Sequence, residues 1–521
     1  MCHKGGCVPD RDGGKYGGVT RRTLFASAAG TALAAGGVVA GAGMDPGGMP
    51  PNLEPKPLRV LPVLTYDVPQ RQQATSWRPW GGIQTEAQAR AELKRIDAEL
   101  AKAVATAGFT VELMPARPVR TPAQAEQVRA ATYDVLIIFA AGNWQNLFQI
   151  MSAPDRWNLM FLRHSPGPVY LWYEIAHPHF LRKAVDEYGE PGWSPADVVV
   201  DSYERLIKRL RALYGLKQTL GKRIVAVGGA SGWGIGYTTA PTIARETWKL
   251  DIVDYPYSEL GKRLQAAMAD TELQAAAAQR AAAYLRTPNT QLQTSQEFFR
   301  NAFILDHVLR QVMAECGTNA ITINACMGTI MPISKTTACL PLSLMNDDGY
   351  LAFCESDFVV IPSGILLHYI SGKPVFLNDP TFPHEGIVTL AHCTAPRKLN
   401  GKKPEPAKIL THFESDYGAA PKVEMRKGQT VTVLIPDFAC KDWLGFLGTV
   451  VDSPLLDICR SQVDIRIHGD CDLVVQRMKG FHWMLSYGDY LDEIGYALYK
   501  LKIGWTNVSA KVASAADSRR I

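Results

Sequence analysis

Leu58-Arg-Val-Leu-Pro-Val-Leu64 is an almost entirely apolar run, and it predicts a buried strand. Residues 85–107 follow, with Ala, Leu and Ile at helical spacing and charged residues between them. A short strand at 110–113, a helix near 122–131 and the apolar strand Asp134-Val-Leu-Ile-Ile-Phe-Ala140 continue the pattern. Because strands alternate with helices, we expect a parallel sheet with helices on both faces.

The same alternation returns further along the chain. Apolar strands are expected at 223–228 and 320–324, and helical spacing is found between them at 259–286 and 292–314. This second cycle predicts another α/β domain with a parallel sheet.

The last third of the chain has a different pattern. Residues 423–435, 462–467 and 472–475 are extended in character and are separated by Gly and Asp turns, which predicts an antiparallel sheet or a small barrel. We therefore expect an α/β protein with two parallel-sheet domains and a mainly antiparallel, barrel-like C-terminal domain. The expected boundaries are 58–221, 222–370 and 371–505, followed by a flexible tail at 506–521.

Composition excludes some classes of protein. Of the 521 residues, 47% are hydrophobic and 20% are charged, which is typical of a globular chain. The formal charge is +5, but residues 1–43 hold five basic and two acidic side chains, so the remainder carries only +2. This balance argues against nucleic-acid binding. No uninterrupted apolar run of about 18 residues is present, which argues against a multi-span membrane protein.

The first 43 residues predict an export signal. Arg21-Arg22 is followed by Leu24-Phe25 and by a weakly apolar, Ala/Gly-rich stretch, the pattern of a twin-arginine signal peptide. The alternative is a disordered Gly/Ala tail with a chance Arg pair. A Pro/Gly linker at 44–57 comes next. With cleavage near Ala42, we expect a periplasmic or otherwise extracytoplasmic protein.

Eight cysteines remain after removal of the signal. They contain no CxxC pair, so a thiolate zinc site is not expected. An oxidising compartment would allow disulfides, whereas folding before export favours buried free thiols. The sequence alone does not indicate which cysteines would form a disulfide. The eight are Cys316, Cys326, Cys339, Cys354, Cys393, Cys440, Cys459 and Cys471.

The glycine-rich segment 228–236 follows a predicted strand, as a phosphate-binding loop would. Its glycines do not have GxGxxG spacing, and no Lys-Ser/Thr follows, so neither a dinucleotide fingerprint nor a Walker loop is present. We expect a structural or sugar-facing loop and no nucleotide cofactor.

Carboxylates end two apolar segments in the second half of the chain. Glu355 and Asp357 follow one predicted strand, and Asp379 ends another, with a helical pattern between them. A strand, a helix and a parallel strand would bring Glu355 and Asp379 to the same sheet edge. His482 lies in a third apolar segment. Alternatively, the acids could be helix-cap and turn residues and His482 a core histidine.

Two carboxylates and an imidazole form a ligand set that suits Mn²⁺, with Mg²⁺, Co²⁺ or Fe²⁺ as competitors. A divalent ion with open positions can hold two sugar oxygens and stabilise an enediolate. A neighbouring carboxylate can then move the proton between C1 and C2.

These segments resemble the L-fucose/L-arabinose isomerase superfamily, and the fucose branch most. The resemblance covers roughly residues 300–505 and includes the loop around His392. It implies that Glu355 and Asp379 are metal ligands and the proton-transfer pair, and that His482 is the third ligand. His392 would be an alternative ligand or second-shell residue, and Asp357 would lie beside the ion or a substrate hydroxyl.

The resemblance also implies two Rossmann-like domains before a mainly β domain, and a homotrimer or homohexamer. It predicts a metal-dependent aldose–ketose isomerase, an intramolecular oxidoreductase that acts on a sugar or sugar derivative. Family isomerases are generally cytoplasmic and longer than this chain, which leaves the substrate open. The alternatives are an exported, non-catalytic carbohydrate-binding protein on the same scaffold and a metal-dependent lyase or epimerase of modified sugars.

Overall fold

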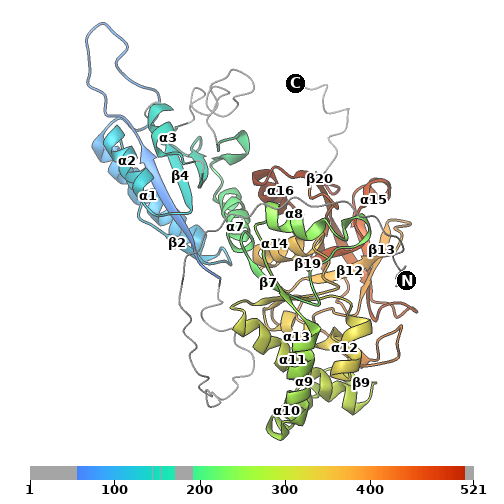
Figure 1. Ribbon diagram of the computed structural model, residues 1–521. Coiled ribbons are helices and arrows are strands. Elements are labelled where there is room, and N and C mark those ends of the chain that lie inside the picture. Colours follow the sequence, from blue (N-terminus) through green and yellow to red (C-terminus); the bar gives the residue numbers. More distant parts are fainter. Residues whose placement is uncertain (1–54, 143–144, 154, 171–191, 511–521) are drawn as a thin grey trace, which may run out of the picture. The chain divides into compact units, whose positions relative to one another are not determined.

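Two parallel sheets with their helices precede a six-stranded antiparallel barrel in the computed structural model of this protein (Figure 1). The predicted fold class is confirmed. The domain boundaries remain predictions. The structure describes residues 55–142, 145–153, 155–170 and 192–510.

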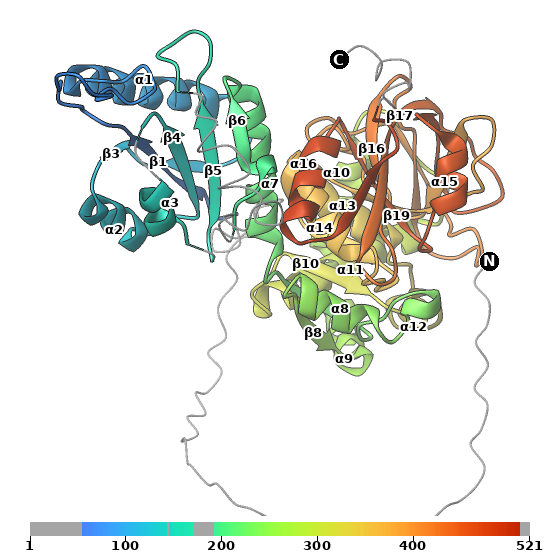
Figure 2. The ribbon, with the colours of Figure 1, turned by 90° about the horizontal axis from the view of Figure 1, so that it is seen from above.

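The first sheet has six parallel strands in the order β2-β1-β4-β5-β6, with β3 paired to β1. All six side chains of β4 are buried, as expected for a strand covered on both faces. Figure 2 shows α1 on one side of this sheet and α2 and α3 on the other. The elements are β1 (Leu58–Thr65), α1 (Glu86–Ala105), β2 (Val111–Leu113), β3 (Arg117–Val119), α2 (Pro122–Ala130), β4 (Val135–Ala140), α3 (Gln145–Met151), β5 (Trp157–Leu162), η2 (Pro195–Asp197), β6 (Val198–Val200) and α7 (Tyr203–Thr219).

The second sheet has four parallel strands in the order β11-β10-β7-β8. The predicted helix 259–286 is two helices, because the Asp270 carboxylate accepts hydrogen bonds from the backbone N–H groups of Glu272 and Leu273 and starts a new helix. The elements are β7 (Arg223–Val227), η3 (Gly234–Gly236), α8 (Ala240–Thr247), β8 (Asp251–Tyr255), α9 (Tyr257–Ala269), α10 (Thr271–Leu285), α11 (Gln296–Glu315), β10 (Ala320–Ile323), α12 (Cys326–Ser334), α13 (Cys339–Asp347), β11 (Leu351–Cys354) and α14 (Ile361–Ser371).

The C-terminal barrel closes because β16 pairs with both β19 and β17. The ring runs β16-β19-β12-β13-β18-β17, and β20 adds to β17 in parallel. A buried apolar cluster that includes Phe376, Val433 and Trp483 belongs to these strands. A small sheet has the order β15-β14-β9. The elements are β9 (Thr290–Leu292), β12 (Phe376–Pro380), β13 (Ile387–His392), β14 (Ala407–Leu410), β15 (Ala420–Val423), β16 (Thr430–Ile435), β17 (Asp442–Asp452), β18 (Ser461–His468), α15 (Cys471–Arg477), β19 (Trp483–Tyr487), α16 (Leu491–Lys500) and β20 (Gly504–Asn507).

Two further local predictions are wrong. Residues 472–475 lie in α15 and not in a strand, because Asp470 caps a helix by accepting from the backbone N–H of Leu473. The strand that carries Asp379 is not a parallel neighbour of β11. It is β12 of the barrel and pairs antiparallel with β13 and β19.

Some predicted segments lie outside the described residues. These are the export signal at 1–43, most of the linker at 44–57 and the end of the tail at 506–521. Among the residues that are described, no helix combines the length and apolar character needed to cross a membrane.

Candidate metal centre

The acidic residues and the histidines come from two sheets. Glu355 follows β11 at the carboxyl end of the second parallel sheet, whereas Asp379 lies in β12 of the barrel. His482 immediately precedes β19, which pairs with β12 so that Trp483 is opposite Asn378. The antiparallel pairing of β12 with β19 brings Asp379 and His482 together. It does so without the predicted parallel pairing of the strands that carry Glu355 and Asp379.

The predicted ligands do lie together. His482 Nε2 is 3.2 Å from Asp379 Oδ1 and 3.5 Å from Glu355 Oε2. The other oxygen of Glu355, Oε1, is 3.7 Å from His392 Nε2. Two carboxylates and two imidazoles therefore face one small space.

Each imidazole is held through its other nitrogen. His482 Nδ1 is 2.8 Å from Asp357 Oδ2, and His392 Nδ1 is 3.0 Å from Thr394 Oγ1. This arrangement turns both Nε2 atoms toward Glu355. Metal-binding histidines are oriented in the same way, by a carboxylate or other polar group on the nitrogen that does not touch the ion. Asp357, predicted to support the ligands or to be an alternative ligand, contacts the nitrogen of His482 that faces away from Glu355.

Three buried polar atoms in this space have no hydrogen-bond partner among the described residues: Asp379 Oδ1, His392 Nε2 and His482 Nε2. Buried polar atoms without partners are costly, so native proteins usually satisfy them or use them. The ligand atoms of these three residues lie within 4.8 Å of one another, and Cys354, Glu355 and His392 form an overlapping set. These buried triads could hold a metal ion.

The pKa values reflect the same crowding. Burial alone would lower the pKa of His482, but the hydrogen bond to Asp357 and the nearby carboxylates of Glu355 and Asp379 raise it well above its ordinary value. Burial would raise the pKa of Glu355, whereas the nearby imidazoles of His392 and His482 lower it. Burial raises the pKa of Asp379 against the opposing effect of the two histidines. The nearby carboxylates therefore favour positive charge on His482.

The backbone at Glu355 is strained. Glu355 and Ser356 have φ of 66° and 48°, the left-handed region that costs a residue other than glycine about 1–3 kcal/mol. Two hydrogen bonds hold the turn: Thr322 Oγ1 accepts from the Ser356 N–H at 3.1 Å, and the Ser356 carbonyl accepts from the Ser231 N–H at 3.3 Å. The strain is therefore retained where the chain must direct Glu355 toward the histidines.

The glycine-rich segment 228–236 packs beside this centre. Trp233 stacks on Phe481 with ring centroids 4.5 Å apart and contacts the edge of His482 at 5.9 Å. The segment 228–236 therefore contacts both the turn after Glu355 and the residues around His482. The sequence did not single out Trp233, Phe481 or Thr394, because only the folded chain brings them to these histidines.

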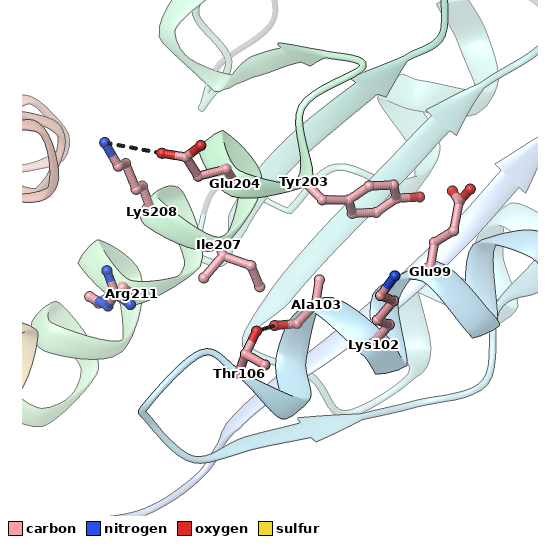
Figure 3. Close-up of a pocket in the computed structure, with 9 residues that line it drawn as sticks. All are labelled: Glu99, Lys102, Ala103, Thr106, Tyr203, Glu204, Ile207, Lys208 and Arg211. Atoms are coloured by element: carbon pink, nitrogen blue, oxygen red, sulfur yellow. Dashed lines mark hydrogen bonds and ion pairs between the residues drawn. The ribbon is translucent and has the colours of Figure 1, made fainter. Parts of the chain in front are cut away.

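A separate pocket of about 630 Å³ lies between α1 and α7 (Figure 3). Its charged groups are largely paired with each other or with neighbours: Lys208 with Glu204 at 3.7 Å, and Arg211 with Glu493 at 2.8 Å. It includes none of the predicted site residues. Its lining is Glu99, Lys102, Ala103, Thr106, Tyr203, Glu204, Ile207, Lys208 and Arg211.

Neither models of protein families nor curated protein sequences give a match to this chain. The assignment of a function therefore depends on the site itself.

Proposed function

We propose that this protein is a divalent-metal-dependent aldose–ketose isomerase in which Glu355, Asp379 and His482 bind Mn²⁺. The observation that carries the proposal is the position of His482 Nε2, which has no hydrogen-bond partner among the described residues and lies 3.2 Å from Asp379 Oδ1 and 3.5 Å from Glu355 Oε2. Oxygen and imidazole ligands suit Mn²⁺. His392 is an alternative ligand, and Asp357 orients His482.

The exposure of these side chains suggests how a sugar would approach. The side chains of His482 and His392 are 0% and 3% exposed, whereas those of Glu355 and Asp379 are 24% and 31% exposed. The imidazoles thus form the closed side of the site. The carboxylates face the side that a substrate can reach, as a proton-transfer pair requires.

When bound, the ion would hold two neighbouring sugar oxygens and stabilise the charge of a cis-enediolate. Glu355 is ionised, because the nearby imidazoles of His392 and His482 outweigh burial and lower its pKa, and as a carboxylate it could accept the proton from C2 of an aldose. Asp379 has a raised pKa and suits proton exchange with the hydroxyl and carbonyl oxygens. Return of the proton to C1 completes the isomerisation.

The proposal extends to location and assembly. We place the enzyme outside the cytoplasm after twin-arginine export, because of Arg21-Arg22 and the Ala/Gly-rich stretch after it. A homotrimer or homohexamer is proposed from the resemblance to fucose isomerases. The partner is a small-molecule sugar.

Proton NMR in D₂O tests the reaction. Protein stripped by a chelator and restored with Mn²⁺ is incubated with a panel of aldoses, ketoses and uronates, and ketose formation and deuterium entry at C1 or C2 are followed. We expect metal-dependent exchange that Asp379→Asn abolishes. The matched control is Asp452→Asn, which removes an exposed carboxylate paired with Lys427.

The outcomes separate the alternatives. Exchange without ketose, together with loss of a substituent, would indicate a lyase, and inversion at C2 would indicate an epimerase. Tight sugar binding without exchange would indicate a carbohydrate-binding protein. The absence of both metal binding and exchange would refute the isomerase proposal.

A further inference from the structure

A second group of side chains that could hold a metal ion lies beside the first centre. Cys339 is the first residue of α13, Cys393 directly follows β13, and His412 lies just after β14. Their ligand atoms all lie within 4.8 Å of one another, and all three residues are buried. Cys393 lies 54 positions after Cys339, and His412 lies 19 positions after Cys393, so the group has no short sequence motif.

The geometry is close to that of a tetrahedral zinc site. With zinc–sulfur bonds of about 2.3 Å, two thiolates on one ion lie roughly 3.8 Å apart. The observed spacing of at most 4.8 Å needs only a small side-chain adjustment to reach this value. His412 Nδ1 is buried and has no hydrogen-bond partner in the described part of the chain, so its lone pair or proton is not satisfied by protein groups there.

A third cysteine is close by. Cys459 packs against the cluster that contains Cys339 and Cys393. It lies two residues before Ser461, which pairs with His392 in the barrel. The Arg460 N–H donates to Cys393 Sγ at 3.4 Å, a contact that stabilises negative charge on sulfur. Three thiols and one imidazole complete a tetrahedral set.

We propose that Cys339, Cys393 and His412, with Cys459 as the fourth ligand, bind a structural Zn²⁺ ion. Thiolates select Zn²⁺, whereas carboxylates and an imidazole suit Mn²⁺, so the two neighbouring sites would take different ions. Each thiol gives up its proton when the ion binds. A single disulfide would satisfy only two of the three sulfurs and would leave His412 unpartnered.

The ion would also support the first site. It joins the start of α13, the end of β13 and the turn before β18 at the residue next to His392. The zinc site does not depend on the isomerase proposal. The absence of CxxC predicts no thiolate zinc site, whereas folding brings two thiols and an imidazole together from distant positions in the sequence.

Cobalt substitution tests the zinc site. Full-length protein is purified with a reductant, stripped of metal and titrated with Co²⁺. We expect a sulfur-to-cobalt charge-transfer band and intense tetrahedral visible bands, both removed by one equivalent of Zn²⁺. Cys354 belongs to the set that overlaps the first centre, so the band must also survive Cys354→Ser to be assigned to the second group.

Variants assign the band to its ligands. Cys393→Ser and His412→Gln should lose or shift it, whereas Glu355→Gln and Cys316→Ser should keep it. Cys316 is a half-buried thiol at the end of α11 and serves as the matched control. The proposal is overturned if wild-type protein shows no charge-transfer band, a result that needs no variant to fold. It is also overturned if mass spectrometry finds a Cys393–Cys459 or Cys339–Cys393 disulfide in the native protein.

Discussion

Two of the buried groups of charged side chains in the described part of the chain differ in one respect. In one group, next to the end of β5, Arg163 Nε is 2.5 Å from Glu92 Oε1 of α1, and its Nη2 is 2.7 Å from Glu99 Oε2. Tyr170 Oη also donates to Glu92, at 2.8 Å. The guanidinium and hydroxyl donors of this group are hydrogen-bonded to carboxylate acceptors within it, so the buried charges are paired.

The group around Glu355 is different. Asp379 Oδ1 and the Nε2 atoms of His392 and His482 lack hydrogen-bond partners among the described residues, although all are buried. Buried charge alone is therefore a poor sign of function, since structural ion pairs bury charge equally well. The informative sign is a set of unsatisfied ligand atoms that point at one another. The predictions below test this difference.

The largest expected effect is on catalysis. Asp379→Asn removes a proposed ligand and a proton-transfer group, so we expect kcat/KM to fall by about 10⁴-fold, at the upper end for loss of acid–base catalysis. The fold should be retained, because the Asp379 side chain is partly exposed. Steady-state kinetics at saturating Mn²⁺ measures the loss. Activity within tenfold of wild type would remove Asp379 from the mechanism.

The next largest effect is on stability and concerns the buried ion pair of Arg163 and Glu92. Arg163→Met leaves Glu92 buried without its cation, and breaking a buried pair in this way costs about 3–5 kcal/mol. Urea unfolding should detect this loss of stability, with Arg205→Met on the exposed face of α7 as the control. The number of Mn²⁺ ions bound per chain should not change. A lost metal site in this variant would contradict the separation of the two groups.

Metal removal should have a smaller effect on stability. Mn²⁺ at 100 times its Kd should raise the free energy of unfolding by about 2.7 kcal/mol, because the ion binds only the folded chain. Urea unfolding with Mn²⁺ and with a chelator measures this increment. Arg163→Met should keep the increment, and Asp379→Asn should reduce it. Equal increments in both variants would indicate that the ion binds elsewhere.

The smallest effect is expected for the residue behind His482. Asp357→Asn weakens the acceptor that fixes His482 Nδ1, and loss of such a partner typically lowers metal affinity by about 10–100-fold. At saturating Mn²⁺, kcat should return close to wild type, since Asp357 positions a ligand and does not touch the substrate. A lasting loss of kcat at saturation would give Asp357 a direct catalytic role.

The sequence predicts the fold class because its strands are long apolar runs that leave little ambiguity. In β4, six buried residues follow one another, and no polar face competes. Residues 472–475 are too short for periodicity to separate strand from helix, and the Asp470 cap decides in favour of helix. The sequence also does not show which strands form the barrel, because closure depends on the pairing of β16 with both β17 and β19 in the folded chain.

The candidate site is predictable only in part. The sequence identifies Glu355, Asp379 and His482 as candidates because each is a polar residue in or next to an apolar segment. It predicts, however, that a parallel strand pairing brings the two acids together, and β12 makes only antiparallel pairings. The groups behind the histidines, Asp357 and Thr394, depend on side-chain direction in the folded chain. The thiol group was missed for the same reason: its members come from three separate elements.

The most direct test of the central claim is a Mn²⁺ titration of the metal-free chain, followed by the electron paramagnetic resonance signal of the free ion. Mn²⁺ avoids thiolate sites, so the titration reports the carboxylate–histidine centre. We predict one tightly bound ion per chain, with affinity reduced at least about 100-fold by His482→Gln and unchanged by Asp452→Asn. The absence of a tight ion, or a tight ion that His482→Gln leaves unaffected, would contradict the account.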